Sequence, residues 1–271
     1  MNLALTIAGS DSGGGAGIQA DIKAMQANGV YAATVITAIT AQNTVAVTEA
    51  FELPVSLVEA QMDAVFDDLP IRATKTGMLS SSEIIEAVAA KIEAREISPL
   101  VVDPVMISKS GFKLLKDDAI DVLKTRLIPL AALVTPNAHE AEHLTGIEVK
   151  SVDAARKAAL RIFEMGPGAV LVKGGHFEDE REAIDVLYDG RSFHTFSAPF
   201  IETKTTHGTG CTYAASIAAN LARGYPLRES IARAKRYVTD AIRYGLAIGE
   251  GHGPTNHFYF FDRCDVFPVA D

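Results

Sequence analysis

The sequence is poor in cysteine and contains no tryptophan. Its two cysteines, Cys211 and Cys264, do not form a Cys-x-x-Cys pair, which argues against a disulfide framework and against a cysteine-based zinc site. His176 and His207 each lack a second histidine four residues away, so zinc is not expected at either of them. The scarcity of cysteine favours a reducing compartment, and we expect a cytoplasmic protein.

Long hydrophobic runs and clusters of basic residues are missing as well. No uninterrupted apolar run is long enough to span a bilayer, and the first residues lack the basic group that precedes the apolar core of a signal peptide. The net charge of -9 and the pI near 5.3 argue against polyanionic partners, which bind clustered Lys and Arg. We therefore expect no nucleic-acid or membrane partner, and an anionic ligand must be held by a local site.

The pattern that is present is an alternation of short apolar segments with amphipathic segments along the 271 residues. Strands that are apolar on both faces and are separated by helices belong to a parallel sheet covered on both sides. We therefore predict one domain, residues 1–271, with an α/β fold: a three-layer α/β/α sandwich around a central, mainly parallel sheet. The expected strands are residues 3–8, 32–38, 71–75, 100–103, 131–134 and 169–173, and the expected helices are residues 17–27, 55–66, 80–94, 117–127, 151–164, 212–223 and 227–247.

Two segments depart from this alternation. Residues 183–188 and 192–196 flank the pair Asp189-Gly190, which favours a type I′ turn, so we expect a β-hairpin that extends one edge of the sheet. Residues 43–53 also alternate as a strand, and we expect them to form a flap over a ligand. Ligands themselves are expected at the carboxyl ends of the parallel strands.

One glycine-containing turn runs directly into a predicted buried helix; its residues are Thr206, His207, Gly208, Thr209, Gly210 and Cys211. Glycines let backbone N–H groups converge, and a helix start carries partial positive charge, so the turn predicts a phosphate-binding site. The thiol lies in the first helical turn, where this field favours the thiolate. The alternative is a helix start whose glycines serve only close packing.

A second glycine-rich loop, residues 9–17, follows the first predicted strand. Its Gly-x-Gly-x-x-Ala spacing matches a dinucleotide-binding fingerprint, but the next strand offers no acidic residue to bind a ribose. The loop also lacks the Gly-Lys-Ser/Thr ending of a P-loop. We interpret it as a place where the backbone at Gly9 approaches a small ligand and Asp11 accepts a hydrogen bond.

Oxygen-bearing side chains follow two further strands. Asp103 ends one predicted strand, and Asn137 and Glu140 lie three residues apart at the start of a helix after the next. Mg²⁺ prefers a few protein oxygens and retains waters that bridge to phosphates, so these three side chains are candidate ligands, directly or through water. A plain capping box is the alternative for Asn137 and Glu140.

Three other side chains are candidates for ligand contacts. Lys173, at the end of a strand, is placed to hold a polyphosphate, or else it is a solvated lysine at a turn. The Gln42 amide offers a donor and an acceptor that suit the edge of an aminopyrimidine, although many such amides only cap backbone groups. Met78 is placed to pack on a ring face, or it fills the core.

Six motifs carry a family resemblance that covers nearly the whole chain: residues 7–21, 76–79, 103–106, 135–140, 172–176 and 207–211. Together they resemble those of the hydroxymethylpyrimidine/phosphomethylpyrimidine kinases, in the ribokinase-like superfamily. The resemblance implies a ribokinase-like fold, which agrees with the pattern above, and ATP and Mg²⁺ as cofactors. It further implies a homodimer that phosphorylates 4-amino-5-hydroxymethyl-2-methylpyrimidine and then its monophosphate, in thiamine biosynthesis.

The resemblance also implies roles for individual residues. It places the transferring phosphoryl group in an anion hole beside Lys173, and the pyrimidine in a separate pocket. The implied anion-hole and phosphate-binding residues are Thr206, Gly208, Thr209, Gly210 and Cys211, and the implied pyrimidine-binding residues are Gly9, Asp11, Gln42, Met78 and Val105.

Position 211 is the point at which the chain departs from the wider superfamily. Sugar and pyridoxal kinases usually carry Asp there as catalytic base, whereas the pyrimidine-kinase branch carries Cys, as this chain does. A thiol needs a lowered pKa to act as the base. Otherwise Cys211 serves only through its backbone amide.

Two other functions are compatible with the sequence. The first is a pyridoxal or pyridoxine kinase of the same superfamily. The second is a non-catalytic sensor of the pyrimidine or nucleotide, against which the candidate metal ligands and the glycine turn argue, because a pure binding protein needs neither.

Overall fold

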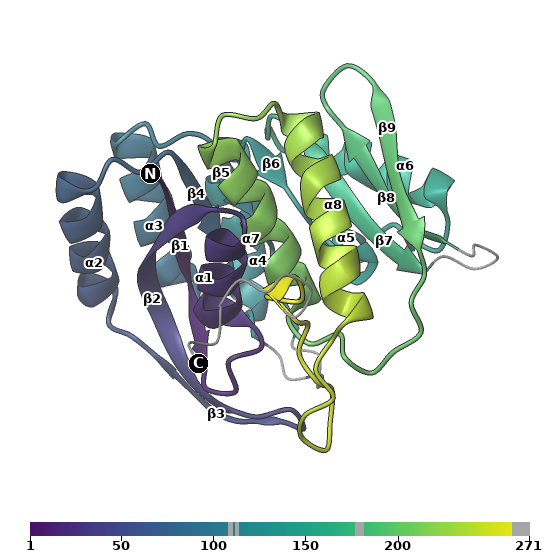
Figure 1. Cartoon of the computed structure of the whole chain (residues 1–271). Helices are drawn as coiled ribbons and strands as arrows, with labels where there is room; N and C mark the ends of the chain where they lie inside the picture. The colour runs from purple at the N-terminus through teal and green to yellow at the C-terminus, as the bar shows by residue number, and fades with distance from the viewer. Residues whose placement is uncertain (108–110, 112–113, 177–181, 262–271) are drawn as a thin grey trace, which may run out of the picture.

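The computed structural model describes residues 1–107, 111, 114–176 and 182–261. A nine-stranded sheet runs through the centre of the molecule and is covered by helices on both faces, so the predicted three-layer α/β/α arrangement is confirmed (Figure 1). The strand order is β3-β2-β1-β4-β5-β6-β7-β8-β9. None of the helices in the described ranges combines the length and apolar character needed to cross a bilayer.

Six neighbouring strands in the middle of the sheet are parallel. Because they are parallel, their carboxyl ends meet at one edge, where functional side chains are expected. In spatial order these strands are β2 (Val30–Gln42), β1 (Asn2–Asp11), β4 (Ala73–Thr76), β5 (Leu100–Val102), β6 (Leu133–Val134) and β7 (Val170–His176).

Antiparallel strands extend the sheet at both sides. β3 (Val47–Glu52) pairs with β2, and β8 (Glu182–Tyr188) and β9 (Phe193–Pro199) form the predicted hairpin beyond β7. The hairpin is confirmed but its predicted turn is wrong. Four residues connect the strands and only Gly190 has a positive φ, whereas a type I′ turn needs two such residues. The Asp189 carboxylate accepts the amides of Arg191 and Ser192, which favours the longer loop.

The helices divide between the two faces of the sheet (Figure 1). One face carries α1 (Gly17–Ala27), α7 (Thr209–Ala222) and α8 (Leu227–Arg243). The other carries α2 (Val55–Asp68), α3 (Ser82–Ala94), α4 (Asp117–Val122), its continuation η1 (Leu123–Leu127) and η2 (Ile128–Leu130), α5 (Ala138–Thr145) and α6 (Val152–Phe163).

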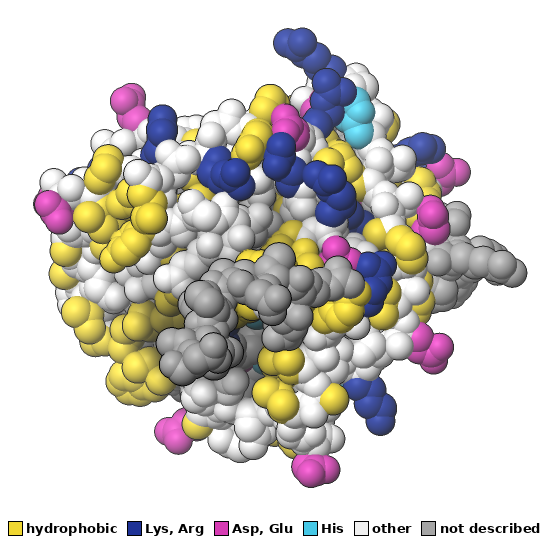
Figure 2. Space-filling model, viewed as in Figure 1, with side chains coloured by type: hydrophobic (Ala, Val, Ile, Leu, Met, Phe, Trp, Pro, Cys, Tyr) yellow, Lys and Arg dark blue, Asp and Glu magenta, His cyan; other side chains and the backbone are white. Residues whose placement is uncertain are grey.

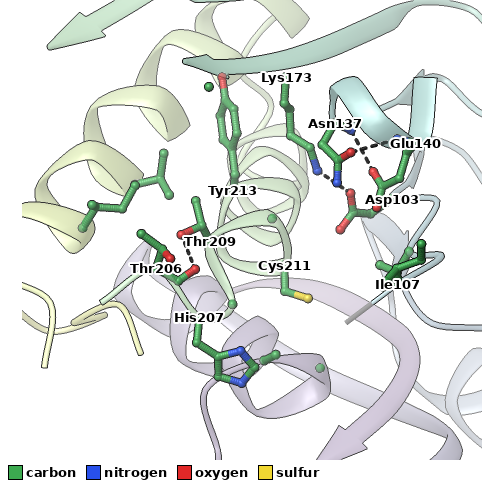
Figure 3. A pocket seen from close by; sticks show the side chains of 18 of the residues that line it. Asp103, Ile107, Asn137, Glu140, Lys173, Thr206, His207, Thr209, Cys211 and Tyr213 are labelled. Atoms are coloured by element: carbon green, nitrogen blue, oxygen red, sulfur yellow. Dashed lines mark hydrogen bonds and ion pairs between the residues drawn. The ribbon is translucent and has the colours of Figure 1, made fainter. Parts of the chain in front are cut away.

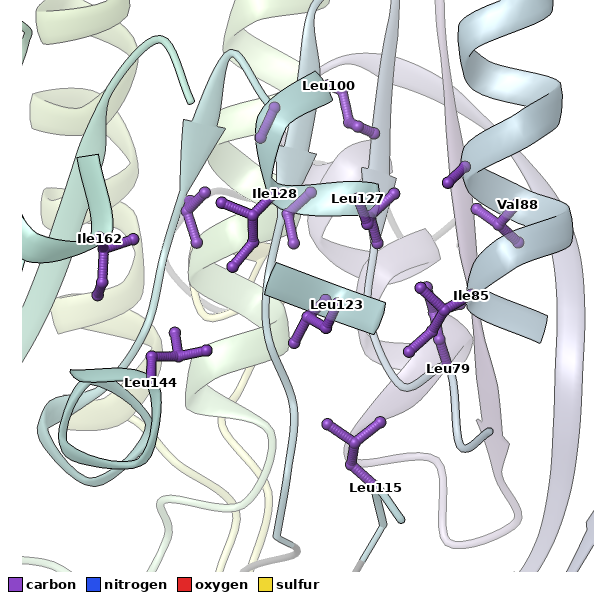
Figure 4. Packing of buried hydrophobic residues seen from close by; sticks show 14 of the residues in the cluster. Leu79, Ile85, Val88, Leu100, Leu115, Leu123, Leu127, Ile128, Leu144 and Ile162 are labelled. Atoms are coloured by element: carbon purple, nitrogen blue, oxygen red, sulfur yellow. The ribbon is translucent and has the colours of Figure 1, made fainter. Parts of the chain in front are cut away.

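Each face of the sheet has its own hydrophobic core, because strands apolar on both sides need cover on both. The core under α2 to α6 is built from branched aliphatic side chains such as Ile85, Leu100 and Leu127 (Figure 4). The core under α1, α7 and α8 is rich in alanine, including Ala214, Ala215 and Ala218. Small side chains let α7 lie close to the sheet, which brings the start of that helix to the carboxyl edge of the strands.

A charged pair is sealed between β4 and α1. Lys75 and Asp21 have no exposed side-chain surface, and the Lys75 Nζ lies 2.8 Å and 3.0 Å from the two Asp21 carboxylate oxygens. The hydroxyl of Thr6 also donates to Asp21, at 2.6 Å. Burial works against the charge of Lys75, but Asp21, together with Cys211 and Asp103, outweighs burial and raises the pKa of the lysine.

We predict that Lys75→Met lowers the free energy of unfolding by about 3–5 kcal/mol, because it leaves the Asp21 carboxylate buried without a counter-charge. Urea unfolding followed by circular dichroism measures the change. The double variant Lys75→Met/Asp21→Leu is expected to recover part of the loss. Lys91→Met, which breaks the partly exposed pair with Asp63, serves as control, and an equal loss there would contradict the prediction.

Candidate active site

A large cavity of about 730 Å³ opens at the carboxyl ends of the parallel strands, as the sequence predicted for a ligand site. The structure brings all the predicted site residues to its wall, although they come from distant parts of the chain. They are Gly9, Asp11, Gln42, Met78, Asp103, Val105, Asn137, Glu140, Lys173, Thr206, Gly208, Thr209, Gly210 and Cys211.

The start of α7 forms one wall of the cavity. Gly208 is the N-cap residue, with φ +76°, and α7 begins at Thr209, three residues before the start that the sequence predicted. A side chain at position 208 would overlap the carbonyl oxygen of Gly15, so the turn needs glycine both for its backbone angle and for this close approach. The N–H groups of Gly210 and Cys211 have no intrahelical acceptor and are suited to an anionic ligand.

Asp103 and Lys173 lie beside this helix start (Figure 3). The Lys173 Nζ is 2.7 Å from the Asp103 Oδ1, which also accepts the Thr135 hydroxyl at 3.0 Å. A Cβ on Gly210 would lie 3.4 Å from the same Nζ, so the lysine faces the glycine turn. Burial disfavours the charge of Lys173, but Asp103 and Glu140 raise its pKa, and the lysine is held as a cation at the anion site.

The Asn137 and Glu140 side chains form a capping box at the start of α5. The Asn137 Oδ1 accepts the amide of Glu140 at 2.9 Å, and the Glu140 Oε2 accepts the amide of Asn137 at 2.7 Å. Burial and the nearby Asp103 carboxylate raise the pKa of Glu140 to about 7, against the opposing effect of Lys173. Glu140 therefore has both predicted roles, because the capping box that stabilises the helix also fixes a carboxyl group in the cavity wall.

The described residues contain no group of three or more His, Cys, Asp or Glu side chains arranged to hold a metal ion. The hydrogen bonds of Asp103 engage its Oδ1, and those of Asn137 serve the capping box, while the Glu140 carboxyl serves the box and also accepts a backbone hydrogen bond from Met106. The three oxygens thus suit a hydrated ion that arrives with a phosphate better than a preformed, fully protein-ligated site.

Asp11 organises the loop between β1 and α1. Its carboxylate accepts the amides of Gly13, Gly15 and Ala16 and a hydrogen bond from His207 at 2.9 Å. Burial opposes the charge, but these bonds outweigh it and lower the pKa of Asp11. The predicted hydrogen-bond acceptor is therefore occupied by the protein itself.

Gly9, Gln42 and Met78 line the same cavity. A Cβ on Gly9 would lie 3.0 Å from the Met78 sulfur, so the glycine leaves room for the thioether. The Ser12 hydroxyl donates to the carbonyl of Gln42 and accepts its amide, which fixes the backbone that carries this side chain. The predicted flap is present only as the β2 and β3 ribbon, and β3 supplies no lining residue among those described.

Cys211 lies in the first turn of α7, and its thiol reaches the cavity (Figure 3). Burial and the carboxylates of Asp21 and Asp103 raise the pKa of Cys211 to about 11, although Lys75 and the Gly17 amide oppose this. The predicted lowering of the pKa is therefore wrong, because burial and the two carboxylates outweigh Lys75 and the Gly17 amide. Cys264 lies outside the described residues.

Sequence reasoning missed several residues of the site. Lys75 forms part of the cavity floor, and the only signal for it is a lysine inside an otherwise buried strand. Nothing in the sequence indicates His207 as a partner of Asp11, although the two side chains contact each other in the structure. An apolar wall between β9 and α8 was also missed; it consists of Phe200, Ile201, Val238 and Ile242.

This sheet order and cavity belong to the ribokinase-like kinases, and the protein is an enzyme of that class. The chain superimposes on a Bacillus subtilis pyridoxal kinase, solved as an ADP complex, with a TM-score of 0.88 and 38% identity over 95% of this chain and 97% of that one. The model of the phosphomethylpyrimidine kinase family matches residues 11–256. The chain belongs to the phosphomethylpyrimidine kinase family.

Two curated relatives differ in how much of their length this chain covers. It is 48% identical to the hydroxymethylpyrimidine/phosphomethylpyrimidine kinase of Bacillus subtilis, over 95% of each chain. It is 53% identical to the thiamine biosynthesis bifunctional protein ThiED of Geobacter sulfurreducens, over 93% of this chain. The chain spans about half the length of that bifunctional relative, 51%.

We predict that Gly208→Ala abolishes turnover and lowers stability, because the added Cβ collides with the carbonyl of Gly15 and moves the start of α7. Gly224→Ala is the matched control, because Gly224 also has a positive φ, +87°, but a Cβ there meets nothing within 4 Å. The control is expected to lose only about 1 kcal/mol of stability and to keep its activity. Thermal unfolding and an ADP-release assay compare the two, and equal behaviour would show that the contact with Gly15 is unimportant.

We predict that alkylation of Cys211 by iodoacetamide is slow at pH 7 and accelerates about tenfold per pH unit up to pH 10. The thiolate is the reactive form, and a pKa of about 11 keeps the thiol protonated below that range. Mass spectrometry of the Cys211 peptide gives the rate separately from that of Cys264. A plateau below pH 9 would instead indicate the lowered pKa that the sequence suggested.

Proposed function

We propose that this enzyme transfers the γ-phosphoryl group of ATP to the hydroxymethyl oxygen of 4-amino-5-hydroxymethyl-2-methylpyrimidine. A second transfer, onto the monophosphate, then gives the diphosphate used in thiamine biosynthesis. The observation that carries the proposal is that one cavity connects the Gly9, Gln42 and Met78 pocket to the helix start at Gly210 and Cys211. Family membership and the names of the relatives support the same substrate.

ATP fits the other half of the cavity. The start of α7 and Lys173 offer positive charge to the phosphates, and the apolar wall formed by Phe200, Val238 and Ile242 offers a surface for adenine. The ADP bound in the related pyridoxal kinase supports ATP as the donor. Phosphoryl transfer depends mainly on positioning and charge stabilisation, which these groups supply.

Mg²⁺ is proposed to arrive with ATP. Asp103 and Glu140 would hold its water ligands, with Asn137 beside them, and the ion would supply neutralising charge for the phosphates. The protein's own contribution is to keep these carboxyl groups in the wall through the capping box and the pair with Lys173.

Cys211 is proposed to receive or relay the proton of the attacking hydroxyl. Because its pKa is about 11, little thiolate exists at neutral pH, and the anion hole supplies the larger part of the acceleration. A loose transition state leaves the proton on the hydroxyl until late in the transfer, so a weakly ionised thiol is compatible with the role.

A pyridoxal kinase is the second candidate, because the structural similarity to such an enzyme is high, with a TM-score of 0.88. Both substrates present a hydroxymethyl group on a flat nitrogen heterocycle, and the cavity accommodates either by size. A non-catalytic sensor is disfavoured. The helix start and Lys173 direct positive charge to one place beside Cys211, where a phosphoryl group would react, and do not surround a whole ligand.

We predict that a coupled ADP-release assay gives the highest kcat/KM with the free pyrimidine alcohol, followed by its monophosphate, and a lower value with pyridoxal. The Cys211→Ala variant is expected to lose at least about tenfold in kcat, because it removes the group that handles the proton. ADP binding by calorimetry should be unchanged in that variant, since the thiol is not needed to hold the nucleotide.

Each alternative outcome has a distinct meaning. Faster turnover of pyridoxal would establish the second candidate, and ligand binding without ADP release would establish a sensor. Near-normal turnover by Cys211→Ala would leave position 211 with only its backbone role in the anion hole.

A cytoplasmic homodimer is part of the proposal, and the β2 and β3 ribbon is its proposed interface. Ile39 and Phe51 are cross-strand neighbours that are 49% and 63% exposed, and Tyr31 on the same ribbon is 52% exposed. Hydrophobic side chains gather over these strands at the lower left of the molecule (Figure 2). An exposed apolar surface on an acidic protein is best explained by contact with a second copy of the chain.

We predict that Phe51→Lys converts the dimer to a monomer in light scattering after size-exclusion chromatography, because a charge replaces the most exposed apolar side chain of the ribbon. Leu160→Lys, at an exposed apolar position on α6, is the control and should remain dimeric. A wild-type protein that is already monomeric would refute the proposed interface.

A further inference from the structure

The side-chain amide of Gln42 is held between two polar groups. Its Nε2 lies 3.3 Å from the Nε2 of His207, and its Oε1 lies 3.2 Å from the hydroxyl oxygen of Thr40. His207 in turn contacts Asp11, and Thr40 contacts the carbonyl of Ser10. The positions of the protons on His207 and Thr40 therefore determine whether the amide oxygen or the amide nitrogen of Gln42 points to each of them.

Asp11 fixes the proton on His207. The carboxylate has a lowered pKa and can only accept, so the ring nitrogen 2.9 Å from its Oδ2 must carry a proton and donate it. A protonated ring nitrogen has no lone pair left in the ring plane. It therefore cannot accept from the amide nitrogen of Gln42, which would place two donors face to face, whereas an amide oxygen there can share the N–H with Asp11.

Thr40 imposes the same condition from the other side. A hydroxyl has one proton, and the Ser10 carbonyl oxygen, at 2.9 Å, is a nearer acceptor than the Gln42 Oε1, at 3.2 Å. Once the Thr40 hydroxyl donates to Ser10, it can only accept from Gln42. The group facing Thr40 must then be the amide nitrogen.

Both ends are satisfied when the amide is turned by half a rotation about its terminal bond, which exchanges oxygen and nitrogen without changing its shape. We propose that the His207 and Asp11 pair, with Thr40, locks the Gln42 amide with oxygen toward His207 and nitrogen toward Thr40. This lock makes the site select a 4-aminopyrimidine ring over its 4-oxo counterpart. The inference rests on the proposed function and names the residues that set its ring specificity.

The selection follows from the order of groups on the ring edge. The 4-substituent is adjacent to the hydroxymethyl group, which must point to the start of α7, and His207 directly precedes that turn. The amide oxygen at the His207 end therefore meets a 4-amino donor, and the amide N–H at the Thr40 end meets the acceptor N3. A 4-oxo ring presents an acceptor and a donor in the opposite order, so both contacts become repulsive.

His207 is thus a positioning residue for Gln42. A free amide turns to suit either ring, whereas a locked amide accepts only one of them. The energetic basis is that a mismatched buried donor or acceptor stays unpaired, which costs far more than the matched bond gains.

The first test reads the lock directly. Long-range ¹H–¹⁵N NMR of the ligand-free wild-type protein at pH 8 should show a proton on the Nε2 of His207. A ring protonated on Nδ1 alone would overturn the proposal, whatever the enzyme phosphorylates.

The second test measures ring selection without turnover. Calorimetry gives the dissociation constants of 2,5-dimethylpyrimidin-4-amine and 2,5-dimethylpyrimidin-4(3H)-one, which lack the reacting hydroxyl. His207→Phe keeps a ring at this position but removes the donor, and we expect the preference for the amine to fall about tenfold. Thr40→Val should also reduce this preference, and Gln42→Ala should abolish it.

Met78→Leu is the matched control, because it alters the same pocket outside the hydrogen-bonded chain and should change both dissociation constants by the same factor. An unchanged preference in both His207→Phe and Thr40→Val would overturn the proposal, since a merely structural role weakens both ligands equally. Failure of the wild type to bind either ring would refute the proposed substrate, while the NMR result would still decide whether the amide is locked.

Discussion

The approach of Gly208 to the carbonyl of Gly15 is the contact on which the site depends. It joins the loop after the first strand to the start of α7, two segments separated by most of the chain. With that contact in place, the Gly17 amide reaches the Cys211 sulfur and His207 reaches Asp11. The helix start, the Gly9, Gln42 and Met78 pocket and the cavity wall at Phe200 are then held in one arrangement, because a single backbone junction sets their relative positions.

Most of the fold follows from local patterns in the sequence. The six parallel strands were predicted from apolar runs, and α1 has the predicted bounds, because residues 17–27 combine a glycine-rich start with apolar residues such as Ile18, Ala24 and Met25 at helical spacing. The site residues could also be predicted, since they follow strands whose carboxyl ends share one edge. The raised pKa of Cys211 could not, because it depends on burial and on Asp21 and Asp103, which only the folded chain brings near. For the same reason the partners of Lys75 and His207 and the apolar wall at Phe200 were missed.

At the start of α5, the same two residues both stabilise the helix and line the cavity. Asn137 and Glu140 satisfy the first amides of the helix, and the same bonds hold a carboxyl group against Lys173 and Asp103 in the cavity. A sequence cannot separate these roles, because one spacing serves both. At position 211 the local and the tertiary effects oppose each other. The helix start favours charge on the thiol, but burial together with Asp21 and Asp103 raises its pKa.

The sealed pair of Lys75 and Asp21 acts as a fixed dipole beneath the site, with its lysine end at the cavity floor. Dissolved ions cannot reach either member, so this part of the electrostatic potential escapes the Debye screening that weakens surface charges. An acidic protein can thereby attract a polyanion at short range even in concentrated salt, where long-range steering by exposed lysines would have vanished.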